Sequence, residues 1–401
     1  MSRAPHRFGE LVQRVLGEAH DATVGVVWGG RRRVALVSAL LAVPLLLTGG
    51  TLGGGWYYST ELLQPAQARV ETFPDTVTEV RRGAEDVVVL SESPETRRKG
   101  TWGLRWEGGS ARVGDIVRQG DGRVERKLLG GDPPRGERVR LDPDVWPGDP
   151  RSALGLDFQE VQVRTELGDM PAWLVPGQGD TWAITVHGRA GTRREALRIM
   201  PALHRLGLPV LAITYRNDRN APPSPDGLYH LGAAEWRDLE AAVRTAQERG
   251  ARHVVLVGWS MGGAIVGQFL GHSELAGLVD RVVLDAPVVS WRDTLDLQAG
   301  NRGLPSAFTP VAELVSGWRA GLDFDRFELA GHPPAHRPPM LLVHGSADSM
   351  VPVSSSRAFA EAAKRMGWPV RFVEFPDAEH TAEWNTDPQR YEEAVTAFLR
   401  G

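Results

Sequence analysis

The chain has 401 residues, 42% of them hydrophobic, which is enough for one large core and additional segments. It contains no cysteine, which excludes disulfides, thiolate nucleophiles, cysteine-ligated zinc and a lipid anchor on cysteine. The net charge of −4 gives no electrostatic reason to expect a nucleic-acid partner.

An uncharged segment at residues 34–58 is the first element along the chain, and it is long enough to cross a bilayer. Arg31–Arg33 precede it directly, and the interface-preferring aromatics Trp56–Tyr58 end it. Because arginines stay on the cytoplasmic side, residues 1–33 are expected in the cytoplasm. The pattern predicts a single-pass protein of the cell membrane, with everything after about residue 60 outside the cytoplasm.

Two other interpretations of this segment stay open. Residues 34–47, followed by Thr48–Gly50, resemble the apolar region and cleavage site of a signal peptide, although a 33-residue leader is long for one. A buried helix of a water-soluble domain is the other alternative, but the glycine-rich second half suits it poorly.

Residues 59–150 have the pattern of a small β-rich accessory region or stalk. Short strand-like runs at 87–90, 101–106 and 124–129 are separated by glycine, proline and charged turns.

Residues 151–401 alternate between strand and helix patterns, which predicts an α/β domain with a mostly parallel central sheet and helices on both faces. Strands are expected at 158–165, 171–175, 182–186, 210–215, 253–257, 281–284, 339–343 and 370–374, and helices at 194–206, 233–249, 355–366 and 389–399. The interval 288–337 interrupts this rhythm and is rich in Trp, Phe, Leu and Pro, so we expect a cap over the sheet there.

The pentapeptide Gly258–Gly262, with the sequence GWSMG, lies between the strand expected at 253–257 and a helix-like run. With 46 glycines in the chain, the pentapeptide alone is a weak signal. Strand, G-x-S-x-G and helix in succession are typical of a nucleophile elbow, in which a sharp turn exposes the serine hydroxyl. Ser260 is therefore the predicted nucleophile.

A serine nucleophile needs a base, and the base needs an orienting acid. His380 is the one histidine after Asp348, and it follows the strand at 370–374 by a short loop, so it is the expected base. Asp348, in the loop HGSADSMVP after a core strand, is the expected acid. Asp285, which directly follows the strand expected at 281–284, is the alternative acid.

The oxyanion of a tetrahedral intermediate requires backbone N–H donors. Met261, the residue after the nucleophile, is expected to supply one, at the start of the helix. The other is expected from the Arg189 amide in the loop HGRAG, which follows the strand at 182–186. This chemistry requires no metal and no cofactor.

The motifs HGRAG, GWSMGG and HGSADSMVP and the late His380 closely resemble those of the α/β-hydrolase superfamily, over roughly residues 158–399. Within it the chain is similar to bacterial serine hydrolases that include Bem46-like and serine-aminopeptidase-like members. The segment 215–227 resembles a loop of membrane-anchored bacterial hydrolases. The resemblance implies an α/β-hydrolase fold and a serine hydrolase that acts through an acyl-enzyme.

The expected substrate is a small or lipid-like ester, or a related acyl compound, outside the cytoplasmic membrane. A serine peptidase of the same fold is one alternative, since the same three residues cleave amides. A non-catalytic scaffold at the membrane is another, although such members typically lack one of the three residues.

Overall fold

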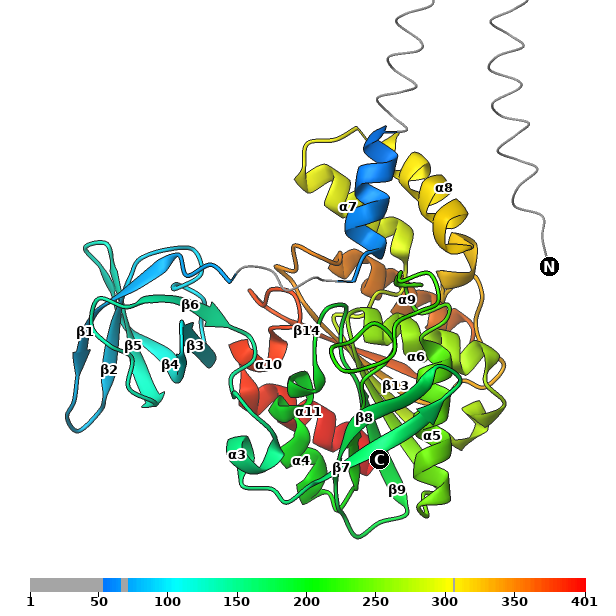
Figure 1. The fold of residues 1–401 in the computed structure, drawn as a ribbon, viewed down its shortest axis with the longest axis horizontal. Coiled ribbons are helices and arrows are strands. Elements are labelled where there is room, and N and C mark those ends of the chain that lie inside the picture. The colour runs from blue at the N-terminus through cyan, green and yellow to red at the C-terminus, as the bar shows by residue number, and fades with distance from the viewer. Residues whose placement is uncertain (1–52, 66–70, 306) are drawn as a thin grey trace, which may run out of the picture.

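The computed structural model describes residues 53–65, 71–305 and 307–401. Figure 1 shows a small β-barrel beside a larger α/β domain, with helices α7 (Trp291–Asn301) and α8 (Phe308–Ala320) at one end of the latter.

The barrel confirms the predicted β-rich region between the N-terminal segment and the α/β domain. Its strands are β1 (Asp75–Arg81), β2 (Val87–Ser91), β3 (Trp102–Trp106), β4 (Gly109–Gly120), β5 (Arg123–Gly130) and β6 (Arg138–Asp142), closed in the order β1-β2-β5-β4-β3-β6. Alternate residues such as Val88, Leu90 and Leu104 point inward into one apolar cluster. The predicted runs correspond to β2, β3 and β5. The other three strands were not predicted because their polar residues interrupt any continuous apolar run.

The α/β domain contains one sheet of eight strands, mostly parallel as predicted. The order is β14-β13-β12-β11-β9-β10-β8-β7, and only the pairs β7–β8 and β8–β10 are antiparallel. The strands are β7 (Gln159–Thr165), β8 (Gly168–Val175), β9 (Thr181–Val186), β10 (Val210–Ala212), β11 (His253–Trp259), β12 (Val279–Asp285), β13 (Met340–Gly345) and β14 (Val370–Phe375).

Helices cover both faces of this sheet, since its central strands are apolar on both sides. In β11, Leu256 contributes to one apolar cluster, while Val255 and Val257 contribute to a second. The first cluster includes residues of α5 (Trp236–Glu248), α6 (Met261–His272) and α9 (Val353–Arg365); the second includes residues of the 3-10 helix η1 (Arg193–Arg198), α4 (Met200–Arg205), α10 (Glu383–Thr386) and α11 (Pro388–Arg400).

Two of the differences between the predicted elements and the structure have a clear local cause. The helix expected at 194–206 is divided into η1 and α4, because Pro201 has no N–H to donate and is tolerated only in a first turn. The strand expected at 210–215 ends at Ala212. Tyr215 is outside it because its N–H donates to the Asp218 side chain, at 2.8 Å.

The interval 288–337, predicted as a cap, holds α7, α8 and the short 3-10 helix η3 (Phe324–Phe327) between β12 and β13. Trp291, Phe324 and Phe327 are buried in the cluster that contains α6.

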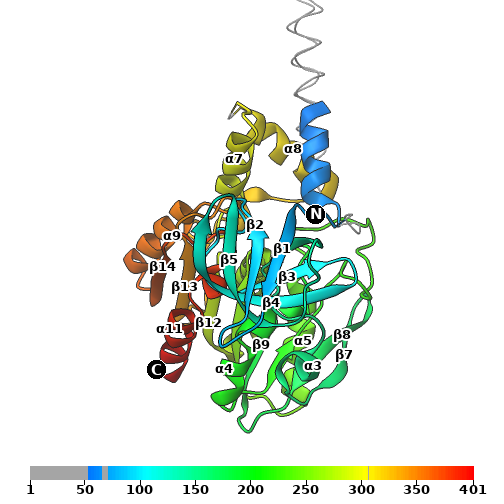
Figure 2. The same ribbon diagram turned by 90° about the vertical axis from the view of Figure 1, so that its left-hand side faces the viewer.

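Residues 53–63 form a helix that lies against α8 (Figure 2). A methyl group on Gly55 would lie 2.8 Å from Val311 Cγ1, so glycine allows the two helices to approach closely. The Arg319 guanidinium lies over the Trp56 ring, 4.3 Å from its centroid, and donates to Thr60 Oγ1 at 2.8 Å.

The predicted membrane segment overlaps this helix at residues 53–58. Its remainder, 34–52, and the predicted cytoplasmic residues 1–33 lie outside the described part of the chain. Among the residues that are described, no helix is long and apolar enough to cross a membrane.

Arg126 is expected to determine the stability of the barrel. It is fully buried in β5, and its guanidinium donates to the carbonyls of Gly114, Thr96, Arg98 and Gly100. Burial lowers its pKa to about 10. Arg126→Ala removes these donors and leaves buried carbonyls without partners, so we expect a loss of unfolding free energy on the order of 3 kcal/mol.

Thermal or urea unfolding followed by circular dichroism measures this loss. Arg123→Ala, on the same strand at an exposed position, is the matched control and is expected to change little. Equal stability of the two variants contradicts the assignment.

Candidate active site

The turn between β11 and α6 carries Ser260 in a conformation that few residues adopt. Its φ is 50° and its ψ is −117°, between Trp259 at the end of the strand and Met261 at the start of the helix. A methyl group on Gly262 would lie 2.2 Å from the Val186 carbonyl oxygen, so a larger residue does not fit beside β9. The turn therefore requires glycine at this position, as the motif predicts.

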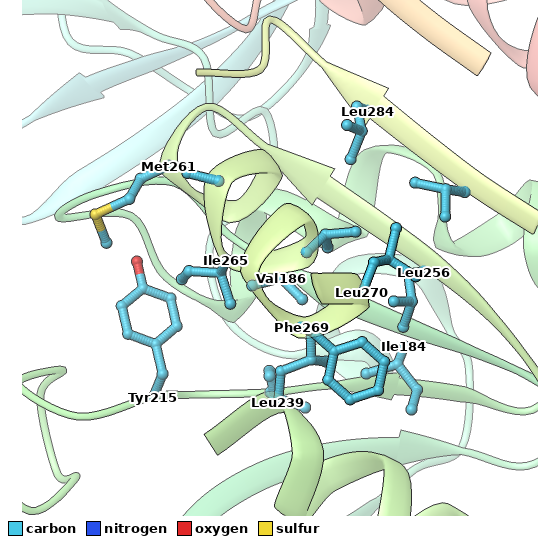
Figure 3. Packing of buried hydrophobic residues seen from close by; sticks show 14 of the residues in the cluster. Ile184, Val186, Tyr215, Leu239, Leu256, Met261, Ile265, Phe269, Leu270 and Leu284 are labelled. Carbon is cyan, nitrogen blue, oxygen red and sulfur yellow. The ribbon is translucent and has the colours of Figure 1, made fainter. Parts of the chain in front are cut away.

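Helix α6 is held against the sheet along most of its length. Figure 3 shows Ile265 and Phe269 of α6 among Ile184, Leu256 and Leu239 from two strands and from α5. This burial fixes the start of the helix, and with it Ser260, at the carboxyl ends of the parallel strands.

The structure brings the three predicted catalytic residues together in one line of hydrogen bonds. His380 Nε2 lies 2.9 Å from Ser260 Oγ, and His380 Nδ1 lies 2.8 Å from Asp348 Oδ2. Asp348 comes from the loop after β13, and His380 from the loop between β14 and α10. The geometry suits proton transfer from the hydroxyl to the imidazole. The catalytic roles themselves stay predictions.

Asp348 is held as an ionised acceptor. Burial acts to raise its pKa, but hydrogen bonds from His344 and His380 and from the Val351 amide hold the pKa well below its usual value. His344 Nε2 lies 3.0 Å from the carboxylate, and its Nδ1 lies 2.8 Å from Ser356 Oγ. His344 was given no role from the sequence; its spacing of four residues from Asp348 in the loop HGSADSMVP is the signal that was missed.

Asp285, the alternative acid, does not contact His380. It is fully buried, and its carboxylate faces the carboxyl group of Glu383 and the hydroxyl of Tyr391. Burial, and then the charge of Asp285 and a hydrogen bond with it, raise the pKa of Glu383 well above its usual value. The two carboxyl groups therefore share a proton, carried by Glu383, and Asp285 is not available to orient an imidazole.

The two elements that carry the predicted oxyanion donors, Met261 and Arg189, both come close to Ser260. Met261 is the first residue of α6, where helix amides have no acceptor within the helix. The loop with Arg189 approaches from β9: a methyl group on Gly188 would lie 3.1 Å from Ser260 Cβ. The Arg189 side chain points elsewhere, since it donates to the Glu61 carbonyl at 3.1 Å.

Buried polar residues hold this loop, and sequence reasoning did not identify their roles. His187 Nε2 lies 2.8 Å from Asp218 Oδ2, and the imidazole stacks on Tyr215 with ring centroids 4.4 Å apart. Burial acts to lower the pKa of His187, but the Asp218 carboxylate raises it overall. Tyr215 Oη donates to the Gly188 carbonyl at 2.8 Å. Across the described chain, no three His, Asp or Glu side chains cluster so that they could hold a metal ion.

Comparisons with known proteins match the barrel and the C-terminal part of the α/β domain to two different families. Residues 226–401 match the prolyl oligopeptidase family, and residues 76–142 match a domain of unknown function, DUF8805. The uncharacterized protein YfhR of Escherichia coli K12 is 25% identical over 250 residues, 60% of this chain and 77% of that protein. The uncharacterized protein Rv2307c of Mycobacterium tuberculosis is 26% identical over 275 residues, 65% of this chain and 86% of that protein.

A solved structure shows the same fold. The Pyrococcus furiosus esterase Pf2001 superimposes with a TM-score of 0.52 and 20% identity, covering 64% of this chain and 95% of that one. The predicted α/β-hydrolase fold is thereby confirmed for the larger domain.

The shared proton of Glu383 predicts a pH-dependent stability. Because its folded pKa is raised, the folded state keeps this proton at pH values where the unfolded state loses it. The contribution is present below the unfolded pKa and is lost as pH rises toward the folded pKa. Glu383→Gln keeps a neutral donor toward Asp285 at every pH. We expect unfolding free energy to fall less steeply between pH 5 and 8 in this variant, measured by urea unfolding.

Glu393→Gln, an exposed position on α11, is the control and is expected to follow the wild-type slope. A Glu383→Gln slope indistinguishable from the wild type contradicts the shared proton.

Proposed function

We propose that this chain, a serine hydrolase of the α/β-hydrolase fold, cleaves a carboxylic ester or a related acyl compound through an acyl-enzyme. The observation that carries the proposal is the continuous line from Ser260 Oγ through His380 to Asp348 Oδ2, with steps of 2.9 and 2.8 Å. A peptide-bond substrate, the alternative, is supported by the match to the prolyl oligopeptidase family, which covers all three residues.

In this mechanism Ser260 Oγ attacks the acyl carbon while His380 Nε2 takes the hydroxyl proton. The carbonyl oxygen becomes an oxyanion and accepts hydrogen bonds from the Met261 and Arg189 amides. Collapse expels the alcohol, which takes the proton from His380. A water molecule then gives a proton to His380 and attacks the acyl carbon, and collapse releases the acid and restores the Ser260 hydroxyl. Asp348 keeps Nδ1 protonated and the ring oriented throughout.

The proposed location is the outer face of the cytoplasmic membrane, with residues 34–58 as the anchor. Support comes from Arg31–Arg33 before the uncharged segment and from the aromatics beside its end. Trp56 and Tyr57 are 51% and 58% exposed, and Trp318 of the neighbouring α8 is 58% exposed. Trp and Tyr favour the membrane–water interface.

The helix at 53–63 also connects this end of the molecule to the candidate site. The Tyr229 N–H donates to the Leu63 carbonyl at 2.7 Å, and Arg189 to that of Glu61. A site so close to the proposed anchor favours lipid-like acyl substrates.

Covalent labelling of the full chain in detergent with a fluorophosphonate probe tests the nucleophile. We expect labelling that maps to Ser260 and is absent in Ser260→Ala. Hydrolysis of p-nitrophenyl esters by an unlabelled sample of the same preparation, but not of aminoacyl-coumarins, supports esters over peptides. The absence of labelling in folded protein contradicts the proposal and favours a non-catalytic scaffold.

The two candidate acids form a matched pair of variants. Asp348→Asn removes the charge that orients His380, and we expect kcat to fall by about 10³-fold or more. Asp285→Asn alters the hydrogen bond with Glu383 and not the contact with His380. We therefore expect its kcat to stay within about tenfold of the wild-type value. The kcat of both variants is measured from ester turnover. A larger loss in Asp285→Asn than in Asp348→Asn contradicts the assignment of Asp348.

The absence of native cysteine makes a topology test direct. Val117→Cys lies at a 48% exposed position of the barrel, and Arg7→Cys lies in the predicted cytoplasmic segment. In intact cells we expect a membrane-impermeant maleimide to modify the first and not the second. Modification of neither, with both modified after lysis, indicates that the barrel is in the cytoplasm.

A further inference from the structure

We infer that the barrel at 75–142 is a positioning domain for the active site, and that it acts by holding residues 381–385, which directly follow His380. The inference rests on the proposed function, because it assigns a role in the same reaction. From the sequence, this region is predicted only to be an accessory region or stalk. The inference assigns it a role in positioning the active site.

Direct contacts join the barrel to this segment. The Thr101 N–H, next to β3, donates to the Asn385 carbonyl at 2.7 Å, and Asn385 Nδ2 donates back to the Thr101 carbonyl at 2.9 Å. Asn385 Nδ2 also donates to the Pro143 carbonyl, just after β6, at 3.1 Å. Ala382, two residues after His380, is buried in the apolar cluster of the barrel itself. The segment is thus held by one backbone hydrogen bond, by two hydrogen bonds from the Asn385 side chain, and by apolar packing.

The barrel presents a fixed surface at this contact. Gly100 has a φ of +86°, and a Cβ at this position would lie 2.0 Å from the Asn385 carbonyl oxygen. The carbonyls of Gly100 and Arg98 accept hydrogen bonds from the buried Arg126 guanidinium, which immobilises the loop from inside the barrel. Any displacement at Gly100 is therefore transmitted to the segment after His380.

From Asn385 the same network reaches both catalytic loops. Arg198 donates to Asn385 Oδ1 at 2.9 Å and also to the Thr381 carbonyl, adjacent to His380. Arg198 Nη2 donates to Glu195 Oε1 at 3.0 Å. Glu195 Oε2 in turn accepts the Gly188 N–H, beside Ser260, at 2.8 Å. Asn385 and Arg198 are positioning residues, since neither touches the reacting atoms.

Two glycines of the barrel give a matched test. Gly100→Ala and Gly108→Ala both place a side chain at positive φ, +86° and +84°, so their backbone strain is alike. Only Gly100→Ala presses on Asn385, because a Cβ on Gly108 meets nothing within 4 Å. In the full chain in detergent, with the folded fraction measured by circular dichroism, each variant is assayed for fluorophosphonate labelling rate and for kcat and KM on the ester.

For Gly100→Ala we expect labelling rate and kcat to fall about tenfold or more, with KM within about twofold. Gly108→Ala is expected to stay within about twofold of the wild type in all three. If the contact between Gly100 and Asn385 only stabilises the fold, Gly100→Ala lowers the folded fraction but leaves the labelling rate and kcat per folded molecule unchanged.

Asn385→Ala is the second variant, and it decides the question if Gly100→Ala does not fold. It is expected to show the same loss of kcat and labelling rate, because it removes the donor to the Thr101 and Pro143 carbonyls and the acceptor for Arg198. Folded Gly100→Ala and Asn385→Ala that label as fast as Gly108→Ala overturn the inference and leave the proposed function intact. A wild-type chain that does not label overturns the proposed function itself.

Discussion

The strained turn at Ser260 is the constraint on which the rest of the site depends. A φ of 50° costs on the order of 1–3 kcal/mol for a residue other than glycine, and it persists only if the surroundings enforce it. Here β11 is paired on both sides by parallel strands, and α6 is buried on the sheet. Gly262 lies against the Val186 carbonyl, so α6 cannot move closer to β9 and no larger residue fits at this position. The fold thus stores the strain that exposes the hydroxyl.

Buried charges organise the remaining geometry around this turn. Four charged side chains near the site are largely removed from water, yet each has partners of opposite charge or several hydrogen bonds. They are Asp348, Glu195, Arg198 and Asp218. Such groups contribute little net stability, but their partners must be placed well for the chain to fold at all. They therefore define one arrangement of the loops around Ser260. The exception is Asp285 with Glu383, where a shared proton takes the place of a cation.

Both accessory parts of the molecule meet the catalytic domain at its loops. The helix at 53–63 contacts the Arg189 loop, and the barrel contacts the segment after His380. Each therefore borders one half of the proposed machinery, either the loop of the predicted oxyanion donor Arg189 or the predicted base His380. An α/β-hydrolase sheet places its chemistry at the carboxyl ends of the strands, where the connecting loops are the least constrained elements. Added segments at that edge limit the freedom of these loops.

The sequence by itself determined the elbow, the order Ser260, Asp348, His380 and the alternating strands and helices. These features follow from local periodicity and from turn chemistry, which neighbouring residues specify. Only the tertiary structure shows that Asp348, and not Asp285, contacts His380, since both aspartates follow core strands and differ in which side chains they meet. It also decided the barrel closure and the contact of Thr101 with Asn385, residues 284 positions apart. Pairings over such separations depend on how whole elements pack, and no local pattern in the chain encodes them.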